Sequence, residues 1–135
     1  MLLLDTNIVS FQFRRDSRLS LFQNALAGQI QAIAFVTLAE LYKWPIERNF
    51  SPERRSALDR LLGSYVVLPF DDALARRWAE LSIQLKRAGR GISDSDAWIA
   101  ATALRHDLSL VTHNRAHFEG IPGLTIISES GRANA

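Results

Sequence analysis

The chain has 135 residues, of which 47% are hydrophobic, and this is the size and composition of one folded domain rather than of a disordered segment. It contains no cysteine, which excludes disulfide bonds and thiolate zinc sites and is compatible with a reducing compartment. Its 16 basic and 14 acidic residues leave a net charge of +2, a mild excess that suits a polyanionic substrate but is not typical of a dedicated nucleic-acid clamp.

The first residues, MLLLDTN, are not expected to form a secretory signal, which would need a basic start and a longer apolar run. Asp5 interrupts the opening leucines after three residues, and no apolar stretch approaches the roughly 20 residues that a membrane-spanning helix needs. We therefore expect a cytoplasmic protein with no membrane partner. Because residues 128–135 are small and polar, we predict a single domain over residues 1–127 followed by a flexible C-terminal tail.

Apolar runs and helical periodicities alternate along the chain. In chain order they predict a strand at 2–4, a helix at 6–13, helix-like spacing at 19–30, a strand at 31–36, a helix at 37–49, a helix from 52, a strand at 65–68, a helix from 72 to about 89, a helix from 94 to about 106, a strand at 108–112 and a fifth candidate strand at 124–127. Three of the helices have typical N-cap residues: Ser51 before Pro52, Asp71 and Ser93. Pro45 should kink or shorten the helix in which it lies.

Strands that alternate with helices are typical of an α/β fold with a parallel sheet covered on both faces. We therefore predict a central, mostly parallel sheet of four to five strands flanked by helices. In such folds, ligands bind beyond the carboxyl ends of the strands.

Four polar residues fall at that same edge of the predicted sheet. Asp5 directly follows the first strand, and Asn114 lies just past the fourth. Glu40 is placed in the first turn of the helix after the second strand, and Asp96 in the first turn of the helix capped by Ser93. Residues far apart in the sequence are thus expected to meet in one crevice.

A group of carboxylates at one crevice suits a divalent metal ion. Mg²⁺ and Mn²⁺ prefer oxygen ligands, and phosphodiester hydrolysis uses such ions to activate water and stabilise the leaving oxygen. Without metal, the negative charges of Asp5, Glu40 and Asp96 would repel one another, and at least one pKa should rise.

Each acid also has a purely structural explanation. The segments Thr37–Glu40 and Ser93–Asp96 both fit a capping box, in which the acid accepts a hydrogen bond from a backbone N–H. Asp5 can cap the helix that follows it. The metal-site hypothesis therefore depends on the joint placement of the three acids rather than on any one of them.

Several segments together resemble one protein family. They are LLLDTNIV at the start, TLAEL in the middle, DSDAWIAATALRHDLSLVTHNRAHF and then IPGLTII. This series resembles the PIN-domain nucleases, and within them the VapC-type toxins of bacterial toxin–antitoxin pairs. The resemblance runs from Met1 to about Ile127 and implies a PIN-like three-layer fold.

The resemblance also implies a set of site residues. The three metal-binding acids of the family match Asp5, Glu40 and Asp96; Asp94 is two residues earlier on the same helix and should point away. The fourth catalytic position matches Asn114, which adds no charge and is assigned a support role. Thr6 and Thr112 can place hydroxyls near the site, or can equally satisfy local backbone groups.

Two further features qualify the expected site. Trp44 stands where the family usually has glycine; it is expected to be a core or subunit-contact residue, and the alternatives are that it stacks on a base or covers the pocket. Two basic groups can contact phosphates: Arg14, Arg15 and Arg18 after the first motif, and Lys86, Arg87 and Arg90 before Asp94. Solvated helix ends, where cationic residues are favoured, explain them at least as well. The histidines have no zinc-type spacing, and none is expected to act as a general base; His117 is a candidate for a substrate contact.

The function implied by the resemblance is that of a Mg²⁺-dependent endoribonuclease, with Mn²⁺ as a substitute, that hydrolyses RNA through a metal-activated water. Such a protein would be a homodimeric toxin neutralised by a cognate antitoxin. The alternative is a catalytically silent PIN-like module that binds RNA or a protein partner. A haloacid-dehalogenase-type phosphatase fits poorly, because its second aspartate would fall at Asn7.

Overall fold

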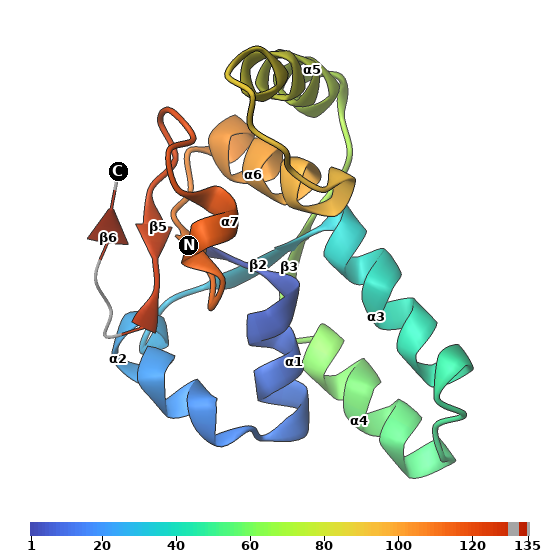
Figure 1. Ribbon diagram of the computed structural model, residues 1–135. Coiled ribbons are helices and arrows are strands. Elements are labelled where there is room, and N and C mark those ends of the chain that lie inside the picture. The colour runs from blue at the N-terminus through green and yellow to red at the C-terminus, as the bar shows by residue number, and fades with distance from the viewer. Residues whose placement is uncertain (130–132, 135) are drawn as a thin grey trace.

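A computed structural model of the protein describes residues 1–129 and the backbone of residues 133–134. Strands and helices alternate along most of the chain, as Figure 1 shows. The elements are β1 (Leu2–Leu4), α1 (Thr6–Arg14), the 3-10 helix η1 (Ser17–Phe22), α2 (Gln23–Leu26), β2 (Gln31–Ala34), α3 (Phe35–Glu47), α4 (Pro52–Leu62), β3 (Val66–Leu68), α5 (Asp72–Arg87), α6 (Asp94–His106), β4 (Leu110–Val111), α7 (Arg115–Phe118), β5 (Ile126–Ile127) and β6 (Ala133–Asn134).

The strands form one sheet in the order β3-β2-β1-β4-β5-β6. The first five strands pair in parallel: Leu3 is in register with Ala32 on one side and with Leu110 on the other. The chain runs outward from β1 in one direction through β2 and β3, and then returns to the other side of β1 as β4 and β5. The predicted α/β class and the central parallel sheet are confirmed.

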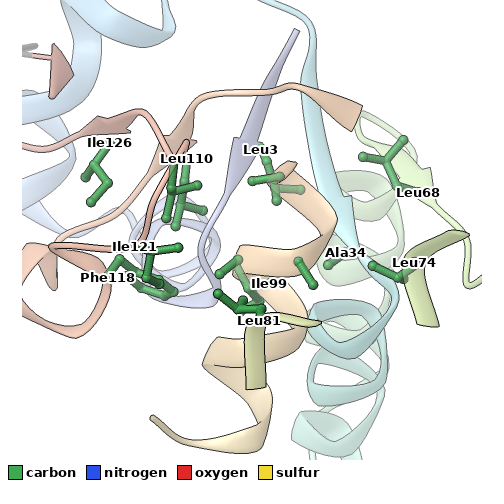
Figure 2. Packing of buried hydrophobic residues seen from close by; sticks show 14 of the residues in the cluster. Leu3, Ala34, Leu68, Leu74, Leu81, Ile99, Leu110, Phe118, Ile121 and Ile126 are labelled. Atoms are coloured by element: carbon green, nitrogen blue, oxygen red, sulfur yellow. The ribbon is translucent and has the colours of Figure 1, made fainter. Parts of the chain in front are cut away.

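The period-two alternation of strand side chains divides the core into two layers. Leu3, Ala32, Ala34 and Leu110 face a cluster completed by α5, α6 and α7. In Figure 2, Leu3, Ala34 and Leu110 of the strands lie above Ile99 and Leu81 of the helices. Leu2, Leu4, Ile33 and Val111 face the opposite cluster, which side chains from α1, α2, α3 and α4 complete. Helices therefore cover both faces of the sheet, and the fold has the three predicted layers.

The three predicted N-cap residues are confirmed. Ser51 accepts a hydrogen bond from the Arg54 N–H (3.2 Å), Asp71 from the Leu74 N–H (2.7 Å) and Ser93 from the Asp96 N–H (3.1 Å). Pro45 lies in the last turn of α3, which ends at Glu47 and so stops two residues before the predicted end.

Several details of the fold differ from the prediction. The segment 19–30 holds a 3-10 helix and one short turn of α-helix instead of a continuous helix, and α7 follows β4 without having been predicted. A sixth strand, β6, pairs antiparallel with β5 inside the tail that was expected to be flexible; residues 130–132 and 135 lie outside the described residues. Its residues, Ala133 and Asn134, carry no apolar pattern that could have indicated a strand.

Across the described residues, no helix has both the length and the apolar character required to span a membrane.

Candidate active site

Asp5 lies at the carboxyl end of the central strand β1, where the chain turns into α1. Its side chain is buried, with 5% of the residue exposed. Oδ1 accepts the backbone N–H of Thr6 (2.7 Å), and Oδ2 accepts the hydroxyl of Thr112 (2.7 Å), which follows the neighbouring strand β4. Asp5 is therefore the N-cap of α1, but it is also tied to a second strand, which capping alone does not require.

Threonine hydroxyls connect Asp5 to the rest of the sheet edge. The Thr112 hydroxyl donates to Asp5 and accepts the backbone N–H of Asn114 (3.0 Å), so it aligns two segments with one carboxylate. On the other side of Asp5, the hydroxyls of Thr6 and Thr37 lie 3.0 Å apart and share a hydrogen bond. Thr112 and Thr37 are fully buried, and their hydroxyls satisfy polar groups that would otherwise be costly to bury.

Asp96 lies in the first turn of α6. Its backbone N–H donates to the Ser93 side chain, while its carboxylate Oδ2 lies 3.1 Å from Nδ1 of His117 on α7. The Asp96 side chain is 20% exposed. Asp94, two residues earlier, is exposed and does not line the pocket described below, as the helical geometry predicted.

Glu40 reaches the same region from α3. The prediction placed it in the first turn of its helix and offered a capping box as an alternative, and both statements are wrong: α3 begins at Phe35, so Glu40 is in the second turn and Thr37 is inside the helix. The Glu40 side chain is 47% exposed, and Oε2 lies 3.8 Å from Nζ of Lys43. Its position is therefore not explained by capping.

The three acids line one pocket of about 260 Å³ together with Thr6, Val36, Ser95 and Ile99. The pocket lies where the start of α6 approaches the start of α3, beside the end of β1 (Figure 1). Asp5, Glu40 and Asp96 are distant in the sequence and come from three different elements. The structure thus brings the predicted acids to one place.

Opposing interactions act on the pKa of the Asp5 carboxyl, and their net effect is to raise it. Burial raises the pKa of the Asp5 carboxyl, and the negative charge of Asp96 raises it further, against the hydrogen bonds from Thr112 and Thr6 that lower it. A cation in the pocket would relieve this opposition, because it favours the ionised form of both carboxylates.

The donor atoms suit a hard divalent cation, since the polar lining is made of carboxylate and hydroxyl oxygens. Within residues 1–129, however, no three acidic or histidine side chains converge closely enough to form a complete metal-binding group. Asp5 and Asp96 are held in place by hydrogen bonds and a histidine, whereas Glu40 is drawn to Lys43 at the rim. The residues fit a cation held by two fixed carboxylates and one adjustable carboxylate.

The remaining sequence candidates divide into two groups. Thr6 lines the pocket and Thr112 orients Asp5, so both lie at the site. Asn114 is exposed and its side chain does not line the pocket; it is linked to the site through its backbone bond to Thr112. Trp44 is 4% exposed and packs in the core, 6.0 Å from the Phe13 ring, in agreement with the core interpretation.

His117 is a site residue whose contact could not be inferred from the sequence. It reaches Asp96 from α7, a four-residue helix with no periodic apolar pattern, and position 117 lies 21 residues beyond its partner. The available signal was its place between Asn114 and the buried Phe118 in the block that carried the family resemblance.

Comparison with known proteins agrees with this geometry. Residues 2–124 match the family model described as the PIN domain. The chain is 31% identical to the VapC ribonuclease Y4jK of Sinorhizobium fredii over 137 aligned residues, covering 95% of this chain and 96% of that protein. It is 33% identical to the ribonuclease VapC2 of Haemophilus influenzae over 125 residues, covering 90% and 92% of the two chains.

A solved structure shares the fold over nearly the whole chain. VapBC2 from Rickettsia felis, crystallised with a DNA fragment from its promoter, superposes with a TM-score of 0.81 at 27% identity, covering 93% of this chain and 96% of that chain.

Proposed function

The chain belongs to the PIN domain family, and from this premise we propose that it is an endoribonuclease, the toxin of a toxin–antitoxin pair, which hydrolyses RNA with Mg²⁺ or Mn²⁺. Two of its relatives are named as ribonucleases, and the similar solved structure is a VapBC assembly. The observation that carries the proposal is the pocket in which Asp5, Glu40 and Asp96 meet.

Asp5 and Asp96 would hold the divalent ion, and Glu40 would face it from α3. When bound, the ion supplies the Lewis acidity that activates a water molecule and polarises a phosphodiester oxygen. The residues around the acids prepare this arrangement. Thr112 and the Thr6 N–H fix the two oxygens of Asp5, while the Ser93 cap and His117 fix the backbone and the carboxylate of Asp96.

Asn114 has a support role in this proposal. Its backbone N–H donates to the Thr112 hydroxyl, which leaves the hydroxyl proton directed at Asp5. Because Asn114 adds no charge and its side chain lies outside the pocket, we assign the direct ligands to the carboxylates alone.

The partners follow from the same proposal. An RNA strand is the substrate, a cognate antitoxin blocks the activity, and the active form is a homodimer that works in the cytoplasm, where the RNA is found. Similar solved structures are VapBC assemblies, and one of them, VapBC-5 from Mycobacterium tuberculosis, is described as a member of a family of toxin–antitoxin systems, which supports the antitoxin assignment.

The proposal is tested by RNA cleavage with purified protein in Mn²⁺ or Mg²⁺. We expect cleavage that stops in EDTA and falls by more than about 100-fold in Asp96→Asn, because a ligand is lost. Asp94→Asn is the matched control: it removes the same charge from the same helix turn, but at an exposed position outside the pocket, and should cut at the wild-type rate.

Two outcomes would contradict the proposal. Cleavage that survives both EDTA and Asp96→Asn would exclude the metal mechanism. RNA that is bound in Mn²⁺ but left uncut would favour the catalytically silent RNA-binding module. The ion pair of Glu40 with Lys43 motivates this alternative, because it engages a carboxylate that the metal site would need.

A further inference from the structure

A second pocket adjoins the acidic one and, unlike it, contains an arginine side chain. It measures about 430 Å³ and is lined by Arg90, Gly91, Ile92, Ser93, Asp96, Ala116 and His117. Asp96 is the residue that both pockets share. A ligand that occupies both would therefore pass directly over the Asp96 carboxylate.

Arg90 is the cationic residue of this second pocket, and its guanidinium is held in position. Nη2 donates to the backbone carbonyl of His117 (3.2 Å), which ties the loop before α6 to α7. Within residues 1–129, no carboxylate forms an ion pair with Arg90. By contrast, Arg18, Arg77 and Arg105 each pair with an acid within 3.1 Å.

Gly120 makes room for this arrangement. Its φ is +79°, and a Cβ at this position would lie 2.9 Å from Nη1 of Arg90, closer than side-chain atoms tolerate. A residue other than glycine would therefore push the guanidinium away from its present position. The pocket, the backbone bond to His117 and the space left by Gly120 together place the Arg90 guanidinium next to the acidic pocket.

We propose that this second pocket binds the RNA phosphate next to the one that is cut, with Arg90 as its anion-binding residue. An arginine with one N–H used by a backbone carbonyl still has four donors, enough to grip a phosphate with two of them. His117 lines this second pocket, and its Nδ1 lies 3.1 Å from the carboxylate of Asp96, which lines both pockets. The inference rests on the proposed function, because it assumes that RNA is the substrate.

The charge of the two pockets gives the physical reason. A pocket lined by three acids repels a polyanion, so the strand must be held by positive charge beside the cutting position. Arg90 provides that charge in a cavity that continues from the site, whereas Lys43, on the other side, is already paired with Glu40 and Glu47. The strand is therefore expected to leave the acidic pocket on the Arg90 side.

The first experiment measures binding of a short single-stranded RNA in EDTA, where metal-dependent cleavage cannot interfere. We expect Arg90→Gln to raise Kd about 10-fold or more, as for a lost charged hydrogen bond, and to reduce the slope of log Kd against log salt by about 0.7. Arg60→Gln is the charge-matched control, because it removes an exposed arginine of α4 outside both pockets. It should change neither quantity beyond the small effect of net charge.

The second experiment uses Gly120 to move Arg90 without removing its charge. Gly120→Ala should weaken RNA binding, since the new Cβ displaces the guanidinium. Gly123→Ala is matched for backbone strain, with a φ of +80°, but its Cβ would only make an ordinary contact with Leu104. Unfolding of both variants is followed by circular dichroism, so that a binding difference at equal stability isolates the displacement of Arg90.

The third experiment identifies the phosphate. In RNA cut at one mapped bond, each phosphate next to that bond is replaced by a neutral methylphosphonate. On one side this should raise the wild-type KM and leave the KM of Arg90→Gln unchanged, because the contact is already absent.

Equal effects on both proteins at both sides, or Arg90→Gln binding RNA like Arg60→Gln, would overturn the inference while leaving the cleavage proposal intact. Absence of wild-type cleavage would instead reject the proposed function, and the EDTA binding comparison would still decide whether Arg90 holds the strand.

Discussion

At the scale of single residues, Asp5 has two duties with opposite energetic consequences. As an N-cap, it satisfies the Thr6 N–H and begins α1 correctly. As a buried acid beside Asp96, it carries a charge in a place where burial disfavours charge. Two hydrogen bonds do not remove this cost, and in the proposed metal site a bound cation would offset it.

This cost predicts a pH-dependent stability in EDTA. The folded-state pKa of Asp5 is raised above its unfolded value, so its neutral form stabilises the fold at acidic pH, and that stabilisation is lost as pH rises through the raised pKa. Chemical unfolding of wild type and Asp5→Asn should therefore show a difference that grows with pH in favour of the variant, which cannot ionise. A difference that stays constant from acidic to neutral pH would contradict the burial argument.

The sequence identified the acidic residues of the candidate site but not the side chains that contact them. Spacing and resemblance selected Asp5, Glu40 and Asp96 and separated Asp96 from Asp94, because helix geometry decides which of two nearby residues shares a face. The pairing of Glu40 with Lys43 and of Asp96 with His117 was not predictable, since side-chain directions depend on packing between elements.

At the scale of elements, α6 connects the fold to the site. Its alanine-rich face, including Ala100, Ala101 and Ala103, is fully buried against the sheet, and its first turn presents Asp96 to the pocket. Ser93 fixes where this helix begins. A shift of the helix start by a fraction of a turn would rotate Asp96 away from Asp5.

Two serine caps allow stability to be separated from activity. Ser93→Ala and Ser51→Ala each remove one cap bond, to the Asp96 and Arg54 N–H groups, and each should lower the free energy of unfolding by about 1 kcal/mol. Only Ser93→Ala should reduce RNA cleavage, because only that cap orients Asp96. The measurement is urea unfolding together with cleavage rates. Equal cleavage losses in the two variants would show that stability alone governs the activity.

The elements that the sequence predicted are those with strong local signals. Capped helices such as α4, α5 and α6 were found with their starts, and buried runs such as Leu2–Leu4 gave their strands. The short elements α7 and β6 were missed, since tertiary contacts or pairing with β5 hold them rather than periodicity or a side-chain cap. The 3-10 helix η1 lies partly in the segment predicted to have helical spacing, but its type and its Asp16 cap were not predicted.

At the scale of the whole molecule, the site lies where the order of the sheet reverses. Strands β2 and β3 extend to one side of β1, and β4 and β5 to the other, so the connections diverge at the carboxyl ends of β1 and β4. Asp5 follows β1 and Thr112 follows β4, and their hydrogen bond spans this reversal. The position is the one where open parallel sheets form a crevice, which explains why the acids collect there.

Asp5 follows β1 and Asp96 lies on α6, so the two residues lie together only in the folded protein. An ion bound by both should therefore stabilise the whole fold. An ion that binds only the folded protein stabilises it by about 2.7 kcal/mol at a concentration 100 times its Kd, which raises Tm by several degrees in a domain of this size. We expect Mn²⁺ to raise Tm for wild type and for the exposed control Asp94→Asn, measured against EDTA by calorimetry.

The Mn²⁺-induced rise in Tm should be much smaller in Asp5→Asn and Asp96→Asn, each of which lacks one fixed ligand. Glu40→Gln should lose less of the shift than either, since its carboxylate is half exposed and already engaged by Lys43. Equal shifts in all five proteins would place the ion elsewhere and remove the acidic pocket as the metal site.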